Sequence, residues 1–108
     1  MTEQALTSID AIAATILRLR GQRVILDSDL ARLYGTTTTR LNQAVKRNAA
    51  RFPDDFMFQI TTAERDEVIT NCDNLQRLKY SPRLPSVFTE HGAVMAATIL
   101  NSNLSLSE

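Results

Sequence analysis

Side chains that can bind nucleic acid are concentrated between residues 38 and 51. They are Thr38, Thr39, Arg40, Asn42, Gln43, Lys46, Arg47 and Arg51. Asparagine and glutamine each offer a donor and an acceptor, so each can bond adenine at two points, whereas arginine and lysine suit guanine or phosphate. Threonine can contact phosphate or the methyl group of thymine. This set is chemically suited to a DNA interface.

The residues before and within this segment have the spacing of a helix-turn-helix motif. Gly35 follows Ala31 by four residues, and Leu41 follows six residues later. A small residue is needed where two helices cross, glycine suits a tight turn with positive φ, and an apolar residue locks the second helix. In that register the side chains that point away from the core are Thr38, Thr39, Asn42, Gln43 and Lys46. A two-helix hairpin without any DNA-binding role shows part of the same pattern and is the alternative interpretation.

The two helices of this motif are predicted over 29–34 and from Thr38 to about Arg51. Asp27 or Ser28 would cap the first helix, and Tyr34 would be buried beside Leu30 and Ala44. The second helix would bury one stripe, and Pro53 would end it. The apolar residues of that stripe are Leu41, Ala44, Val45, Ala49 and Phe52.

Strands and further helices surround the motif, so the predicted fold class is α+β, with a winged-helix-like arrangement. Two aliphatic runs around Arg20-Gly21-Gln22 predict a β-hairpin after an N-terminal arm or helix at 1–14; one helix through Leu19 is the alternative. Strands are expected at 56–60 and 87–88, and a helix at 61–71 with a capping box of Thr61 and Glu64. A loop would span 72–85. A last helix, capped by Thr89, would run from Glu90 to about Leu100 before a frayed tail at 103–108. Its inward side chains would be Val94, Ala97 or Thr98, and Ile99.

The charges are segregated along the chain although they cancel overall. The sequence has 12 basic and 12 acidic residues, for a formal net charge of zero. Residues 18–51 carry eight basic and two acidic side chains, a net charge of +6, whereas residues 52–75 carry one and six, a net charge of −5. One interpretation is a basic face for phosphates; the other is that the two blocks pair with each other.

The sequence argues against several other classes of protein. One cysteine, Cys72, and one histidine, His91, cannot form a disulfide or a structural metal site, so no metal and no cofactor are expected. Glu90 and His91 are the sole neighbouring acid and imidazole, and adjacent helical residues do not face each other, so no enzyme is expected. No run of about 20 apolar residues and no basic leader occur, so we expect a cytoplasmic protein with no membrane partner and no small-molecule substrate.

Three ordered blocks resemble a known family. They are RGQRVILDSDLARLYG at 20–35, RLNQAVKRNAARFPDDFMFQIT at 40–61 and LPSVFTEHGAVMAATILNS at 84–102. The chain is similar to the phage "ORF-six N-terminal" domain, of the KilA-N group found in phage antirepressors and prophage proteins. The resemblance implies a KilA-N-like DNA-binding domain at 15–102 that binds double-stranded DNA in transcriptional regulation or antirepression, without catalysis. A homodimer, and a phage repressor protein captured through Tyr80, Leu84 and Val87, are the further partners considered.

Overall fold

The computed structural model describes residues 15–71, 78–79 and 83–107. The arm or helix expected at 1–14, Cys72 and Tyr80 therefore lie outside the described residues. The described chain is a small α+β domain, as predicted, and its strands form one antiparallel sheet. The order of its elements is strand, strand, two helices, strand, helix, strand and a long helix.

A tight hairpin opens the described chain. Strand β1 (Ile16–Leu19) pairs antiparallel with β2 (Gln22–Leu26). The two residues between them, Arg20 and Gly21, have φ of 54° and 74°. Positive φ at both central residues is the signature of a type I′ turn, whose twist matches that of the strands it joins. The hairpin prediction is confirmed, and a helix through Leu19 is wrong.

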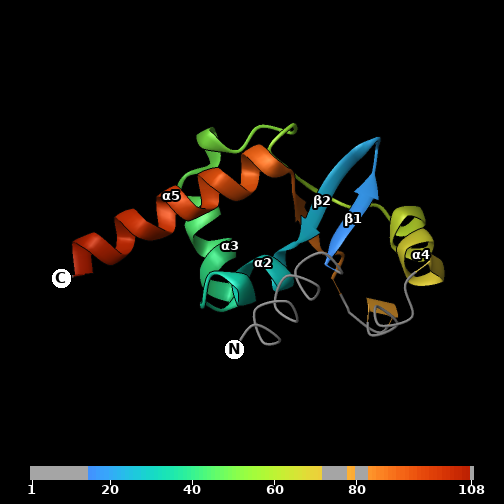
Figure 1. Cartoon of the computed structure of the whole chain (residues 1–108), viewed down its shortest axis with the longest axis horizontal. Coiled ribbons are helices and arrows are strands. Elements are labelled where there is room, and N and C mark those ends of the chain that lie inside the picture. The colour runs from blue at the N-terminus through green and yellow to red at the C-terminus, as the bar shows by residue number, and fades with distance from the viewer. Residues whose placement is uncertain (1–14, 72–77, 80–82, 108) are drawn as a thin grey trace, which may run out of the picture.

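The hairpin and the predicted pair of short strands belong to a single sheet with the order β1-β2-β4-β3. Strand β3 (Met57–Gln59) and strand β4 (Ser86–Phe88) are antiparallel, and β4 also pairs with β2 through Ile25 and Leu26. Figure 1 shows β1 and β2 beside the strands from the C-terminal half of the chain. A junction between residues about 60 positions apart is not visible in local sequence patterns.

The helices differ from the sequence prediction mainly at their ends. Helix α2 (Asp27–Leu33) begins two residues early, directly after β2, and its N-cap, Leu26, makes no side-chain capping bond. The predicted cap at Asp27 or Ser28 is therefore wrong: Asp27 lies in the first turn, where its Oδ1 accepts the N–H of Ser28 at 2.8 Å. Helix α4 (Thr62–Asn71) begins one residue late, whereas its capping box is confirmed, because Thr61 and Glu64 bond each other's backbone N–H at 2.8 and 3.1 Å.

Helix α3 (Thr38–Arg47) starts where predicted but ends four residues early. Asn48 leaves the helix with φ of −122°, and its side-chain amide donates to the carbonyl of Ala44 at 2.8 Å. A short 3₁₀ helix, η1 (Ala49–Arg51), follows. As a result Ala49, predicted to be buried, is exposed, while Phe52 still enters the core.

Helix α5 (Glu90–Ser107) is longer than predicted. It continues through residues 103–107, where a frayed tail was expected. Figure 1 shows its C-terminal half extending beyond the rest of the domain. Ile99 is buried as predicted, but Val94 is 67% exposed, and Ala96 takes the inward place instead.

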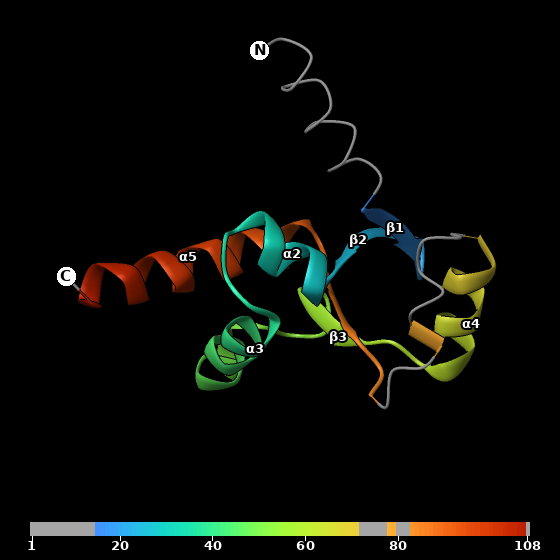
Figure 2. The same cartoon turned by 90° about the horizontal axis from the view of Figure 1, so that it is seen from below.

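Two apolar clusters lie on the two faces of the sheet, because successive strand residues point to opposite sides. One cluster joins the hairpin and β3 to α4; the other joins Ile25 and Phe88 to α2, α3 and α5. In both views α3 and α4 lie on opposite sides of the sheet (Figures 1 and 2). The face carrying α3 is thereby separated from the acidic helix α4.

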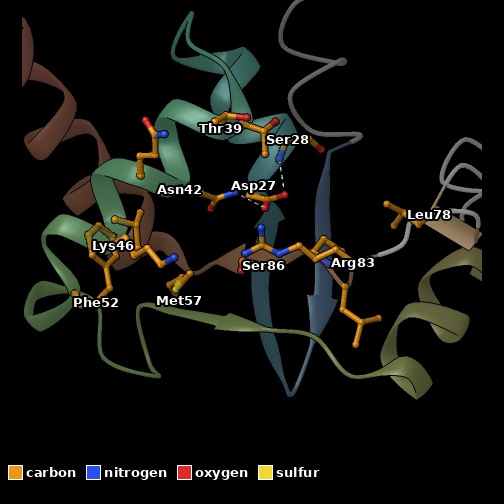
Figure 3. A pocket seen from close by; sticks show the side chains of 16 residues that line it. Asp27, Ser28, Thr39, Asn42, Lys46, Phe52, Met57, Leu78, Arg83 and Ser86 are labelled. Carbon is orange, nitrogen blue, oxygen red and sulfur yellow. Dashed lines mark hydrogen bonds between the residues drawn. The ribbon is translucent and has the colours of Figure 1, made fainter.

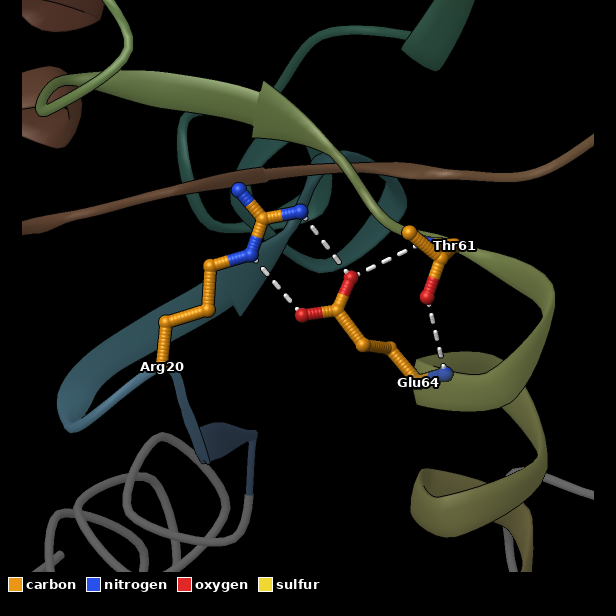
Figure 4. A network of polar contacts seen from close by, with 3 residues as sticks. All are labelled: Arg20, Thr61 and Glu64. Carbon is orange, nitrogen blue, oxygen red and sulfur yellow. Dashed lines mark hydrogen bonds and ion pairs between the residues drawn. The ribbon is translucent and has the colours of Figure 1, made fainter.

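A polar network ties α4 to the tip of the hairpin (Figure 4). The guanidinium of Arg20 donates to both carboxylate oxygens of Glu64, at 2.8 and 3.1 Å, and lies 3.9 Å from the centroid of the Phe58 ring. The hydrogen bond from Arg20, followed by that from the backbone of Thr61, lowers the pKa of Glu64 to about 2. The network fixes α4 on the side of the sheet remote from α3.

Candidate nucleic-acid interface

Helices α2 and α3 are joined by a tight turn that has the predicted geometry at three positions. Ala31 and Leu41 are both buried, and Gly35 has φ of 70°, the left-handed conformation expected for it. The N–H of Thr36 donates to the carbonyl of Ala31 at 2.9 Å, which closes the end of α2. The hydroxyl of Thr37 accepts the N–H of Arg40 at 3.1 Å and caps α3.

Helix α3 rests on α5 and the sheet. Leu41, Ala44 and Val45 pack into the same cluster as Ala96 and Ile99 of α5. Tyr34 is not buried, contrary to prediction, but its hydroxyl donates to the carbonyl of Ala93 in α5 at 2.9 Å. Its partial burial raises the pKa of that hydroxyl. These contacts hold α3 with its polar side outward.

The outward side of α3 forms one wall of a groove with a cavity volume of about 750 Å³. Residues 83–86, which lead into β4, form part of the opposite side, and Phe52, Met57 and Leu78 add apolar lining. Figure 3 shows the Arg83 side chain extending into this groove from the side opposite α3. Five predicted site residues line the groove: Thr38, Thr39, Asn42, Gln43 and Lys46.

The other three predicted site residues lie outside the groove. Arg40 and Arg47 are seven residues apart on α3, so they share one side of the helix, and Arg51 follows in η1. All three are exposed, as are Gln43 and Lys46. Across the described part of the chain, neither these three arginines nor Lys46 form an ion pair. Helix α3 thus carries a mixed polar stripe along the groove and an arginine stripe beside it.

The two charge blocks pair with each other only in part. Arg20 of the basic block bonds Glu64 of the acidic block, whereas Arg23 of the basic block pairs at 2.6 Å with Glu90, which lies outside the acidic block. Both pairs lie at the hairpin, and neither involves α3. The positive charge on α3 and η1 is therefore not neutralised by the ion pairs that the structure describes.

Asn42 differs from its neighbours on α3 because its amide already has a partner. It is half-buried, and its Nδ2 donates to Oδ2 of Asp27 at 3.2 Å. The other oxygen of that carboxylate accepts the N–H of Ser28. One amide hydrogen of Asn42 is thus engaged, whereas its amide oxygen accepts no hydrogen bond from any residue within the described ranges.

Sequence reasoning missed the groove residues outside α3. The polar ones are Asp27, Ser28, Arg83 and Ser86. Asp27 was considered only as a helix cap, and nothing in the local pattern around Arg83 indicates that it lies opposite a helix 40 residues earlier. Val87, expected as an exposed protein contact, is fully buried in β4, so that expectation is wrong; Leu84 lines the groove.

Three features of the described residues bear on other functional classes: metal ligands, His91 and membrane-spanning helices. No group of three or more histidine, cysteine or acidic side chains that could hold a metal ion occurs among the residues described. His91 is exposed and stacks on Phe56, with ring centroids 5.6 Å apart. None of the described helices is long and apolar enough to cross a membrane.

Comparison with known proteins gives one result. The family model of the ORF6N domain matches residues 14–99, which include every described strand and the described helices up to Ile99 of α5. No curated protein and no solved structure matches the sequence.

Proposed function

Since the chain belongs to the ORF6N domain family, we propose that it binds duplex DNA through the outward side of α3, acting as a helix-turn-helix in transcriptional regulation or antirepression of the phage or prophage type. The observation that carries the proposal is the composition of that helix. Hydroxyl, amide and cationic side chains share its exposed surface, and no described acid neutralises its cations. The proposal involves no catalysis and no cofactor.

The dimensions of α3 suit the major groove. The ten residues of α3 make a helix about 15 Å long, and an α-helix with its side chains is about 10–12 Å across, which a major groove about 12 Å wide admits. In this docking mode the first turns of the second helix contact base edges. Thr39 and Gln43 lie in those turns and are exposed, so they are the proposed base contacts together with Asn42.

The cationic side chains of α3 and η1 occupy two places: the groove of the protein and the exposed surface beside it. Lys46 lines the groove, whereas Arg40, Arg47 and Arg51 flank it. Neutralising about four phosphates would give a slope of log K against log salt near −3 to −4. The acidic helix α4 lies at the far end of the domain and would stay away from the DNA (Figure 2).

The experiment is a salt titration of binding to a fluorescent random duplex, followed by anisotropy. Arg47→Ala is expected to lower the slope by about one unit. Lys79→Ala is the matched control, because Lys79 is an exposed cation that lies outside α3 and η1. A binding constant unchanged between low and moderate salt would overturn the proposal and would favour capture of a phage repressor protein instead.

A further inference from the structure

A buried carboxylate stands at the edge of the proposed DNA interface. Asp27 lines the groove but is only 8% exposed, and it belongs to α2, not to α3. A negative charge beside a surface that must approach phosphates weakens binding by like-charge repulsion. Asp27 must therefore contribute something that offsets this repulsion, and its two hydrogen bonds indicate what that contribution is.

The carboxylate of Asp27 fixes which atom of the Asn42 amide points inward. A carboxylate can only accept hydrogen bonds. With Nδ2 inward, the contact is a hydrogen bond of 3.2 Å; with the amide reversed, two acceptor oxygens would face each other without a proton. The N–H of Ser28 holds the other oxygen of the carboxylate at 2.8 Å, so the carboxylate itself cannot easily turn (Figure 3).

We propose that Asp27 is a positioning residue that locks the Asn42 amide with its oxygen toward the groove, and so makes Asn42 select a base that carries a major-groove amino group. This inference rests on the proposed function. The exposed oxygen accepts an N–H from adenine N6 or cytosine N4, and adenine also receives the remaining amide hydrogen at N7. Guanine and thymine present acceptors there, so they can take only the remaining amide hydrogen, leave the amide oxygen without a donor and bind less well.

A structural role alone would have a different signature. If Asp27 merely joined α2 to α3, removing its carboxylate would lower the stability of the domain and weaken binding to all duplexes alike. In the proposed role, Asp27→Asn leaves random-duplex affinity equal or higher, because a repulsive charge is lost, while discrimination between bases falls. The asparagine at position 27 can donate as well as accept, so it permits both orientations of the Asn42 amide.

The test begins with selection of preferred sites from random duplexes by the wild-type protein and by Asn42→Ala. The base pair whose preference disappears in Asn42→Ala is the one read by Asn42. The wild-type protein is expected to prefer adenine over guanine there by roughly 5- to 100-fold. Asp27→Asn is expected to reduce this ratio to below about 3-fold. Asp29→Asn is the control, since it removes the same charge from α2 but does not line the groove.

A base analogue supplies a second arm that needs no variant of Asp27. Replacing the selected adenine by 2-aminopurine moves the amino group to the minor groove, so the wild-type protein should lose about 5-fold or more in affinity and Asn42→Ala should lose none. Equal affinity of the wild-type protein for both bases, or a guanine or thymine selected at this position, would overturn the inference. A folded Asp27→Asn variant that prefers adenine as strongly as the wild-type protein would also overturn the inference. If the wild-type protein binds no duplex at all, the result contradicts the proposed function itself.

Discussion

Replacing Gly92 with alanine should destabilise the domain, although alanine is the better helix former by about 1 kcal/mol. A Cβ at Gly92 would overlap the carbonyl oxygen of Phe56 and lie 2.7 Å from its carbonyl carbon. That carbonyl is held in place, because it accepts the N–H of Thr89 at 2.9 Å. The hydroxyl of Thr89 also donates to the carbonyl of Asp55 at 2.8 Å. The start of α5 must therefore move away from the turn before β3.

The magnitude follows from these contacts. Overpacking against backbone costs about 1–3 kcal/mol, and one or two weakened hydrogen bonds cost about 1 kcal/mol each. After subtracting the gain in helix propensity, the free energy of unfolding should fall by about 1–4 kcal/mol. For a domain of this size, the melting temperature should fall by roughly 5–25 °C.

The assay is thermal unfolding followed by circular dichroism, with Gly35→Ala as the comparison. A Cβ at Gly35 meets no atom within 4 Å, so that variant reports only the strain of φ 70°, about 1–2 kcal/mol. A double-mutant cycle with Thr89→Val adds a further check, because the Thr89 bonds are already disturbed in Gly92→Ala and the two losses should not add. A Gly92→Ala protein that melts at or above the wild-type temperature would refute the close approach of α5 to Phe56.

Three further predictions concern charge and binding. The lowered pKa of Glu64 means that its ion pair with Arg20 stabilises the fold above about pH 4.5 and loses this effect as the pH falls towards 2. In acid unfolding curves, Glu64→Gln should therefore lose less stability than the wild-type protein over that range. Equal losses in the two proteins would contradict the ion pair. Gln43→Ala should weaken the free energy of binding to a selected site by about 1–3 kcal/mol and leave binding to random DNA nearly unchanged. Lys46→Ala should weaken binding to the selected site and to random DNA alike. The reverse pattern would exchange the roles of the two residues. Cys72→Ser, His91→Gln and treatment with a chelator should leave duplex binding unchanged, and binding lost to the chelator would reveal a metal.

Local features of this fold were predictable because a few neighbouring residues determine them. The capping box of Thr61 and Glu64 needs only a spacing of three, and the conformation of Gly35 follows from a turn that a side chain would strain. The hairpin likewise follows from two aliphatic runs around Arg20 and Gly21.

Features that depend on distant residues were not predictable. Helix α3 ends early because the Asn48 side chain competes for the carbonyl of Ala44, and nothing in the apolar stripe signals this. The pairing of β2 with β4 joins segments separated by α2, α3, η1, β3 and α4. The partner of Asn42 is Asp27, 15 residues earlier on another helix, so the pattern of α3 alone shows Asn42 as a fully outward side chain.

The most direct test of the central claim is an NMR titration of the ¹⁵N-labelled protein with a duplex, read as amide chemical-shift changes along the chain. If α3 is the DNA interface, the largest changes fall in α3 and η1, at residues 38–51, and α4, at residues 62–71, changes little. Changes concentrated on α4 or the hairpin, with α3 unaffected, would contradict the claim that α3 is the DNA interface.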